Sequence, residues 1–152
     1  PAWPPASPSP TTATGGRKSA RKHKTQRNAA LLERALAQKG DDCYLLYQLG
    51  RCYDLAGDAA RALRYYERAL PLIPDLRLAY VCGLVTACGY AHLHAGDVPG
   101  AAALGRFAGS LGQNPDFAFM LAYADMLAGR FTQAAEGFLR CTSLSGGERE
   151  GV

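Results

Sequence analysis

The chain is built from short segments in which apolar residues recur at intervals of three and four positions. One such segment carries Leu31, Leu32 and Leu36 and ends at Gly40. This spacing places the apolar side chains on one face of an α-helix. No segment has the alternation that is typical of a strand. The pattern predicts an all-α protein with about seven antiparallel helices, whose expected ranges are 19–39, 43–56, 59–73, 77–95, 98–112, 115–128 and 131–143.

Three of these segments share a further pattern, in which a first helix ends at a glycine turn and an alanine-rich second helix follows. The turns lie at Gly57, Gly96 and Gly129, so they are 39 and 33 residues apart. The most complete copy runs from Cys43 to Leu76. Its repeated residues are Leu46, Leu49, Gly50, Tyr53, Gly57, Asp58, Ala62, Tyr66, Ala69, Leu70 and Pro74. Three copies in phase indicate a structural repeat.

These residues resemble the tetratricopeptide repeat (TPR), a helix–turn–helix unit of about 34 residues. Leu46 stands at the Trp position of that signature, and Tyr66 stands at the Phe position. The resemblance implies a helical-hairpin solenoid, because one such repeat cannot bury its apolar face without stacked neighbours. Small residues are expected where two helices approach closely. These are Gly50, Ala62, Ala69, Gly89, Ala101 and Ala134.

The repeat phase divides the chain of 152 residues into successive parts. Residues 1–17 are rich in Pro, Ser and Thr, and we expect them to form a disordered linker. Residues 18–42 hold a basic segment and the lead-in helix of an incomplete repeat. The second of three repeats contains about five extra residues around 75–81, which we expect to lengthen the helix that follows. The repeats span 43–76, 77–114 and 115–148, and a tail spans 149–152.

A second resemblance concerns the residues around the first repeat. The runs KTQRN at 24–28, LLE at 31–33 and YLLYQLGR at 44–51 are similar to the TPR tail of bacterial family 2 glycosyltransferases. Cys43 stands where that family usually carries Pro, and the Asp-x-Asp metal motif of its catalytic domain is absent. The resemblance implies a cytoplasmic, non-catalytic accessory region attached to a glycosyltransferase domain. The alternative is that the chain belongs to an active glycosyltransferase and contributes acceptor contacts.

The positive charge of the chain is local. The formal net charge is +4, and six basic residues lie in the segment 17–27 without an acidic neighbour, so the remainder carries −2. The six are Arg17, Lys18, Arg21, Lys22, Lys24 and Arg27. One interpretation is binding to nucleic acid or to an anionic surface. A solvated helix start is favoured, because no aromatic residue lies among the charges and no nucleic-acid-binding motif is present.

No catalytic or metal-binding motif is found, so we expect no enzymatic activity, cofactor or metal in this chain. His92 and His94 would point to different sides of a helix. His92 takes the Tyr position of the second repeat and is expected to pack in the core, with His94 more exposed. The uncharged run 78–96 holds too many polar residues and glycines for a membrane span. The cysteines contain no C-x2-C pair and are expected to be reduced; they are Cys43, Cys52, Cys82, Cys88 and Cys141.

The TPR resemblance implies that a protein or peptide ligand binds in a concave groove lined by the first helix of each repeat. Offsets of three and four residues place each set of side chains on one helical face. Aromatic and arginine side chains are frequent in binding hot spots. The alternative is that some of these tyrosines cover the edge of the core. The predicted groove residues are Tyr44, Tyr47, Arg51, Asp54, Thr86, Tyr90, His94, Phe119, Tyr123 and Met126.

Overall fold

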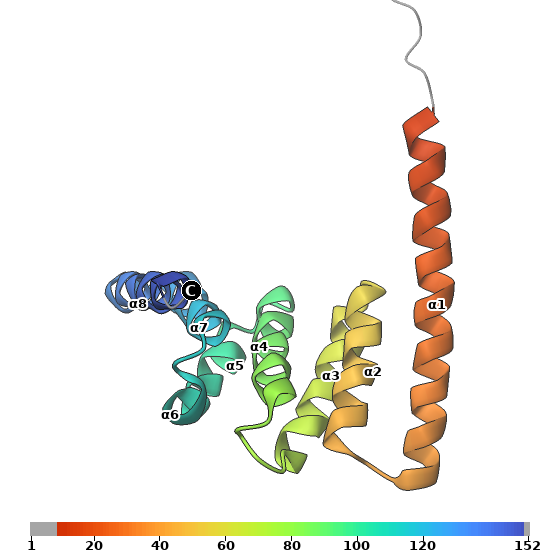
Figure 1. The fold of residues 1–152 in the computed structure, drawn as a ribbon, viewed down its shortest axis with the longest axis horizontal. Coiled ribbons are helices and arrows are strands. Elements are labelled where there is room, and N and C mark those ends of the chain that lie inside the picture. Colours follow the sequence, from red (N-terminus) through yellow and green to blue (C-terminus); the bar gives the residue numbers. More distant parts are fainter. Residues whose placement is uncertain (1–8, 151–152) are drawn as a thin grey trace, which may run out of the picture.

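The computed structural model describes the backbone of residues 9–150 and the side chains of residues 20–145. Every regular element in this range is helical, which confirms the all-α prediction. Figure 1 shows the helices in a row, with α1 (Ser9–Lys39) at one end and α8 (Phe131–Glu150) at the other. Helices that follow one another in the chain pack together, and α4 also contacts α7.

All seven predicted helical segments are present, and six of them are single α-helices. These six are α1, α2 (Cys43–Leu55), α3 (Ala59–Ala69), α4 (Ala79–His94), α7 (Pro115–Leu127) and α8. The segment expected at 98–112 is broken. It consists of α5 (Val98–Ala102), the 3₁₀ segment η2 (Ala103–Phe107) and α6 (Ala108–Leu111). Glycine and proline are the poorest helix formers, and this stretch holds Pro99, Gly100, Gly105 and Gly109.

Three further boundaries differ from the prediction. Helix α8 continues to Glu150, beyond the predicted end at residue 143. The helix expected at 59–73 ends at Ala69 and continues only as the 3₁₀ turn η1 (Leu70–Leu72), because Pro71 has no N–H to donate to the preceding turn. The extra residues around 75–81 were expected to lengthen the next helix, and α4 has 16 residues, against 13 in α2 and 13 in α7. The rest of the insertion forms a turn in which Asp75 Oδ1 accepts a hydrogen bond from the backbone N–H of Arg77 at 2.9 Å, so α4 begins at Ala79 and not at the expected residue 77.

The amino-terminal boundary also differs. Helix α1 begins at Ser9, so the part of the predicted disordered linker that falls on residues 9–17 is helical here. Residues 1–8 of that linker lie outside the described residues. Pro10 stands in the first turn, where its missing N–H breaks no hydrogen bond. A helix nucleated in the apolar part of α1 can therefore extend back to this point by one hydrogen bond per residue.

Each helical hairpin turns at a glycine in the left-handed conformation. The φ angles of Gly57, Gly96 and Gly129 are 84°, 79° and 83°. An L-residue with a Cβ atom rarely adopts this conformation. In the first two hairpins the next residue caps the second helix, because Asp58 and Asp97 each accept a hydrogen bond from the backbone N–H three positions on, at 3.1 and 3.0 Å. The repeated glycine turns thus fix where each hairpin reverses direction.

The small residues predicted at close helix contacts are buried, and these are Gly50, Ala62, Ala69, Gly89, Ala101 and Ala134. Gly50 of α2 faces the ring of Tyr66 in α3, so that a Cβ added at Gly50 would lie 2.5 Å from Tyr66 Cε1. Gly89 of α4 faces Met120 of α7 in the same way. Tyr66 and Met120 are both fully buried in one core that extends from α2 to α7.

Helix α1 packs through its carboxyl-terminal half. Ala29 is buried there, and Glu33 Oε1 accepts a hydrogen bond from Tyr53 Oη at 2.6 Å. The amino-terminal half extends past the ends of α2 and α3 in Figure 1. The basic residues with described side chains, which are Arg21, Lys22, Lys24 and Arg27, are exposed. A solvated helix start and a binding patch would both be exposed, so the favoured interpretation of this segment stays a prediction.

Candidate functional site

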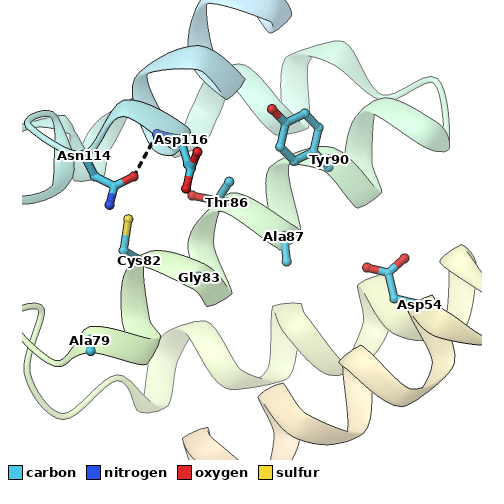
Figure 2. Close-up of a pocket in the computed structure, with 9 residues that line it drawn as sticks. All are labelled: Asp54, Ala79, Cys82, Gly83, Thr86, Ala87, Tyr90, Asn114 and Asp116. Atoms are coloured by element: carbon cyan, nitrogen blue, oxygen red, sulfur yellow. Dashed lines mark hydrogen bonds between the residues drawn. The ribbon is translucent and has the colours of Figure 1, made fainter. Parts of the chain in front are cut away.

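A cleft of about 550 Å³ opens where the end of α2, one face of α4 and the start of α7 meet. Its size lies within the range of ligand pockets, which is about 300–1,000 Å³. Figure 2 shows the side chains that these three helices contribute. The lining residues are Asp54, Ala79, Cys82, Gly83, Thr86, Ala87, Tyr90, Asn114 and Asp116.

Three of the ten predicted groove residues line this cleft, namely Asp54, Thr86 and Tyr90. Thr86 and Tyr90 lie on the same face of α4 because they are one helical turn apart. Thr86 is 9% exposed, and Tyr90 is half-buried. Burial raises the pKa of Tyr90, and the negative charge of Asp116 raises it further. The helical offsets therefore identified two of the α4 residues that line this cleft.

The other predicted residues of the first repeat form an aromatic cluster beside the cleft. Tyr47 stacks on Tyr80 of α4 with 6.0 Å between ring centroids, and Tyr44 meets the same ring edge-on at 5.1 Å. Tyr47 Oη also reaches the cleft wall, since a Cβ added at Gly83 would lie 2.6 Å from it. The guanidinium carbon of Arg51 lies 5.8 Å from the Tyr47 ring centroid. Tyr47 thus packs against the core and borders the cleft at once.

The remaining predicted residues do not line this cleft. The Phe119 ring packs on Phe138 of α8, with 5.2 Å between centroids, so it serves the contact between the last two helices. His94 and Met126 are exposed near the carboxyl ends of α4 and α7. Tyr123 is half-buried on α7. The predicted groove face of the third repeat therefore contributes less to the cleft than the first turn of α7 does.

Sequence reasoning missed Cys82, Asn114 and Asp116. Cys82 lies one turn before Thr86 on α4, and the same helical spacing could have identified it. Asn114 is the N-cap of α7, where its Oδ1 accepts hydrogen bonds from the backbone N–H groups of Asp116 at 2.9 Å and Phe117 at 3.2 Å. This cap fixes the first turn of α7, and with it the position of Asp116 at the cleft. Burial raises the pKa of the Cys82 thiol.

Asp54 closes the α2 end of the cleft. One of its carboxylate oxygens, Oδ2, accepts a hydrogen bond from Tyr66 Oη at 3.1 Å. Burial raises the pKa of Tyr66, and the neighbouring Asp54 charge raises it further, so the phenol keeps its proton and stays a donor. The position of Asp54 is therefore fixed by a side chain of the core.

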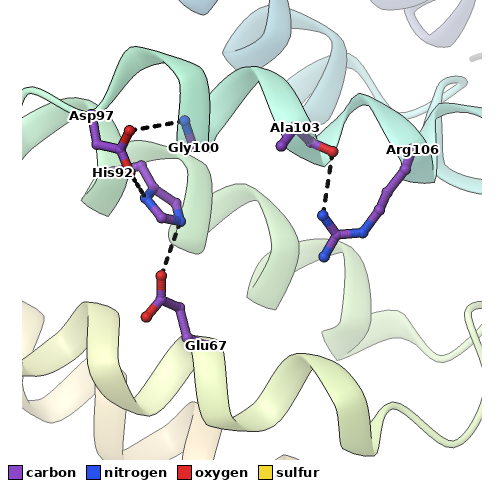
Figure 3. Close-up of polar contacts among 6 residues, drawn as sticks. All are labelled: Glu67, His92, Asp97, Gly100, Ala103 and Arg106. Carbon is purple, nitrogen blue, oxygen red and sulfur yellow. Dashed lines mark hydrogen bonds and ion pairs between the residues drawn. The ribbon is translucent and has the colours of Figure 1, made fainter.

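A second cleft, of about 570 Å³, lies between α3 and the segment of α5 and η2. His92 borders it and is 8% exposed, so the structure confirms its prediction as a packing residue. Its Nδ1 lies 2.9 Å from Asp97 Oδ2, and its Nε2 lies 3.5 Å from Glu67 Oε1 (Figure 3). Sequence reasoning did not predict these polar contacts. They connect α3, α4 and the turn before α5 through one side chain.

The five cysteines are all free. Among the residues with described side chains, no three or more His, Cys, Asp or Glu residues are grouped so that they could hold a metal ion. Within residues 9–150, no helix combines the length and the apolar character that crossing a bilayer requires.

No model of a known protein family matches this chain, and no curated protein matches it either. The resemblances to tetratricopeptide repeats and to the tail of family 2 glycosyltransferases therefore rest on the residues named above and stay predictions.

Proposed function

We propose that this chain is a non-catalytic scaffold of TPR-like repeats that binds a protein or peptide segment across α2, α4 and α7. The observation that carries the proposal is the cleft itself, to which the first helices of three successive hairpins all contribute side chains. In this arrangement a bound segment would contact one face of each repeat in turn, which is how helical-repeat proteins use their extended surfaces.

The order of contacts supports the repeat interpretation. Each first helix packs on its own second helix, as in the pairs α2–α3, α4–α5 and α7–α8. Helix α4 also packs on α3 of the preceding hairpin and on α7 of the following one. The left-handed glycine turn recurs in all three hairpins, at Gly57, Gly96 and Gly129. Repetition of both the packing and the turn is what a stack of equivalent units requires.

The aromatic residues beside the cleft support binding of a polypeptide. Tyr47 and Tyr90 present large side chains on two different helices, and both are half-buried and thus already partly ordered. Tyrosine contributes a large contact area at a low cost in conformational entropy, and it is frequent among the residues that dominate binding energy. The resemblance of residues 24–51 extends the proposal to an accessory region of a glycosyltransferase, and the gene sequence upstream of Arg17 tests that extension.

The binding proposal is tested by selecting peptides from a displayed random library on the purified protein and measuring their affinities for variants. Replacing Tyr47 and Tyr90 together by Ala should weaken binding by about thirtyfold or more, because one hot-spot aromatic contributes roughly 2 kcal/mol or more. The matched control replaces Tyr53 and Tyr65, which stack on each other at 5.5 Å and do not line the cleft. Circular dichroism checks that each variant stays folded.

The possible results separate the proposal from its alternatives. Binding that is lost in the Tyr47 and Tyr90 variant and kept in the control supports the groove. Binding that survives that variant, but falls steeply with salt and disappears when the basic residues of 17–27 are neutralised, would assign the function to the basic segment of α1. Failure to select any peptide that depends on Tyr47 or Tyr90 would contradict the proposed function.

A further inference from the structure

We infer that the cleft between α2, α4 and α7 binds the cationic side chain of a lysine or arginine. The peptide that would present this side chain rests on the proposed function. The cation preference is carried by three observations of its own, which are the pairing of the aspartates, the state of one buried hydroxyl and the composition of the cleft wall.

The first observation concerns the eight aspartates of the chain, all of which have described side chains. Six of them lie within 4 Å of a lysine, arginine or histidine nitrogen, and these six are Asp41, Asp42, Asp58, Asp75, Asp97 and Asp125. Among the described residues, the two without such a partner are Asp54 and Asp116. Both line the cleft, from α2 and from α7 respectively. The two aspartates that no described cation neutralises therefore lie at one site. Glu33 and Glu136 also have no such partner among the described residues, and neither of them lines the cleft.

The second observation concerns the hydroxyl of Thr86. Its Oγ1 atom is buried and has no partner among the described residues that meets hydrogen-bond geometry. The Cys82 thiol is near enough for the Thr86 hydroxyl to lower the pKa of that thiol, but a thiol is a weak partner that leaves room for a stronger one. A threonine inside a helix commonly donates to the carbonyl four residues earlier, and Thr25 and Thr142 do so, at 2.8 and 3.2 Å. Thr86 does not, and its side chain lines the cleft together with Asp116 (Figure 2). A buried polar group without a partner is costly, so this hydroxyl is available to a ligand.

The third observation is the composition of the cleft wall. No lysine or arginine lines it. The nearby Arg51 guanidinium lies over the Tyr47 ring instead of pairing with Asp54, although both residues lie on α2. The wall also contains Tyr90, whose ring face can attract a cation. Both aspartates are exposed. Two carboxylates and an aromatic ring around one cleft are expected to favour a positively charged group and to disfavour a carboxylate.

The geometry indicates how such a group would bind. A guanidinium or ammonium group at the α7 end of the cleft would donate to the Asp116 carboxylate and to Thr86 Oγ1. Hydrogen bonds between charged partners are shorter and stronger than neutral ones. Asp54 already accepts one hydrogen bond from Tyr66 Oη through Oδ2. Its role would be to add negative potential at the other end of the cleft.

The test is a titration of the isotope-labelled full chain with small probes, in which binding is measured from the NMR chemical shifts of the backbone amides. The probes are Nα-acetyl-arginine amide, the uncharged analogue Nα-acetyl-citrulline amide, and Nα-acetyl-glutamate amide. The arginine probe should shift amides in the ranges 82–90 and 114–117. Its binding should be about tenfold or more tighter than that of citrulline, because the charge on one hydrogen-bonding partner is lost. The glutamate probe should leave these amides unshifted.

Two variants with matched controls locate the binding. Asp116→Asn keeps the shape of the side chain and should weaken the arginine probe by about tenfold. Asp125→Asn, on the same helix but paired with Arg130 at 2.8 Å, should leave the affinity unchanged. Thr86→Val should raise the melting temperature, because it removes a buried hydroxyl without a partner, and should weaken the probe. Thr142→Val, at a threonine that bonds its own helix, should do neither.

Several outcomes would overturn the inference: equal binding of arginine and citrulline, full affinity in Asp116→Asn, or a shift of the same amides by glutamate or by Mg²⁺ alone. A Thr86→Val variant that is more stable but binds the arginine probe with unchanged affinity would show that the Thr86 hydroxyl takes no part in binding. The proposed function fails separately, if no peptide depends on Tyr47 and Tyr90. Peptides that depend on these tyrosines but contain no required lysine or arginine would leave the function standing and contradict the cation preference.

Discussion

The contact between α2 and α3 at Gly50 allows a prediction in which helix propensity and packing act in opposite directions. Replacing Gly50 by Ala adds one methyl group to the interior of α2. An added Cβ would lie 2.5, 2.7 and 3.1 Å from Tyr66 Cε1, Cδ1 and Cζ. Carbon atoms in good contact are about 3.5–4.0 Å apart. The Tyr66 ring is fully buried and its Oη donates to Asp54, so the ring has little freedom to withdraw.

Two terms set the size of the effect. Glycine to alanine in a helix interior stabilises the folded state by about 1 kcal/mol through propensity, whereas overpacking a core by one methylene-sized group costs about 1–3 kcal/mol. Gly109→Ala provides the matched control. Gly109 has negative φ, and an added Cβ there would have nothing within 4 Å. Gly109 lies in the four-residue helix α6, so the control should show at most the propensity gain and no overpacking cost.

The assay is thermal and urea unfolding, and the loss of helix is measured by the circular dichroism signal of α-helices. A difference of about 1–3 kcal/mol corresponds to roughly 2–12 °C in melting temperature for a chain of this size. Gly109→Ala should melt above the parent and Gly50→Ala clearly below the control. If Gly50→Ala were as stable as Gly109→Ala, the close contact between α2 and the Tyr66 ring would not exist, and the expectation that this repeat position needs a small residue would be wrong.

Three further predictions concern the caps, the thiols and the first helix. Asp97→Ala should lower the free energy of unfolding in urea by about 2 kcal/mol or more, because it removes an N-cap and the partner of His92. Asp58→Ala removes a cap and an exposed ion pair, so it should lower the free energy of unfolding by about 1 kcal/mol. Equal losses in the two variants would contradict a role for the His92 contact. Burial raises the pKa of Cys88 to about 12 from 9.0, so Cys88 should resist alkylation at about pH 8 until the protein unfolds. Because the pKa is higher in the folded state, the stability that the neutral thiol contributes is present below pH 9.0 and is lost as the pH rises towards 12. A chain that starts at Arg17 should keep its melting temperature, because the first buried residue of α1 among the described side chains is Ala29; a clear loss in calorimetry would show that the preceding residues contact the core.

The helix positions could be predicted because local chemistry sets them. A capping Asp or Asn and a left-handed glycine need only neighbouring residues, and Asp42, Gly57 and Asn114 act at the expected helix ends. The broken helix after Asp97 was less predictable, since several weak helix formers had to be weighed against an apolar pattern that favoured one helix. There the backbone preference of glycine and proline prevailed.

The candidate site could be predicted only in part. Helical offsets identified Thr86 and Tyr90, because those two residues share a face of one helix. The offsets could not show that Asp116 would approach the same cleft from another helix, since that depends on how α4 packs against α7. Nor could they show that Phe119 would be used in the contact with α8. Contacts between helices far apart in sequence depend on tertiary packing, which helical periodicity does not determine.

The broken segment between α4 and α7 has a consequence for the dynamics of the whole stack. Helices α4 and α7 form two walls of the cleft, and the chain between them consists of two short α-helical pieces and a 3₁₀ segment. Hydrogen bonds in 3₁₀ segments have poorer geometry than those in α-helices, and short helical pieces have few of them. Local opening should therefore require the least free energy in residues 98–111, where amide hydrogen exchange should be fast relative to α4 and α7. Because α4 and α7 also pack directly on each other, such opening of the connecting segment should leave these two walls of the cleft in place.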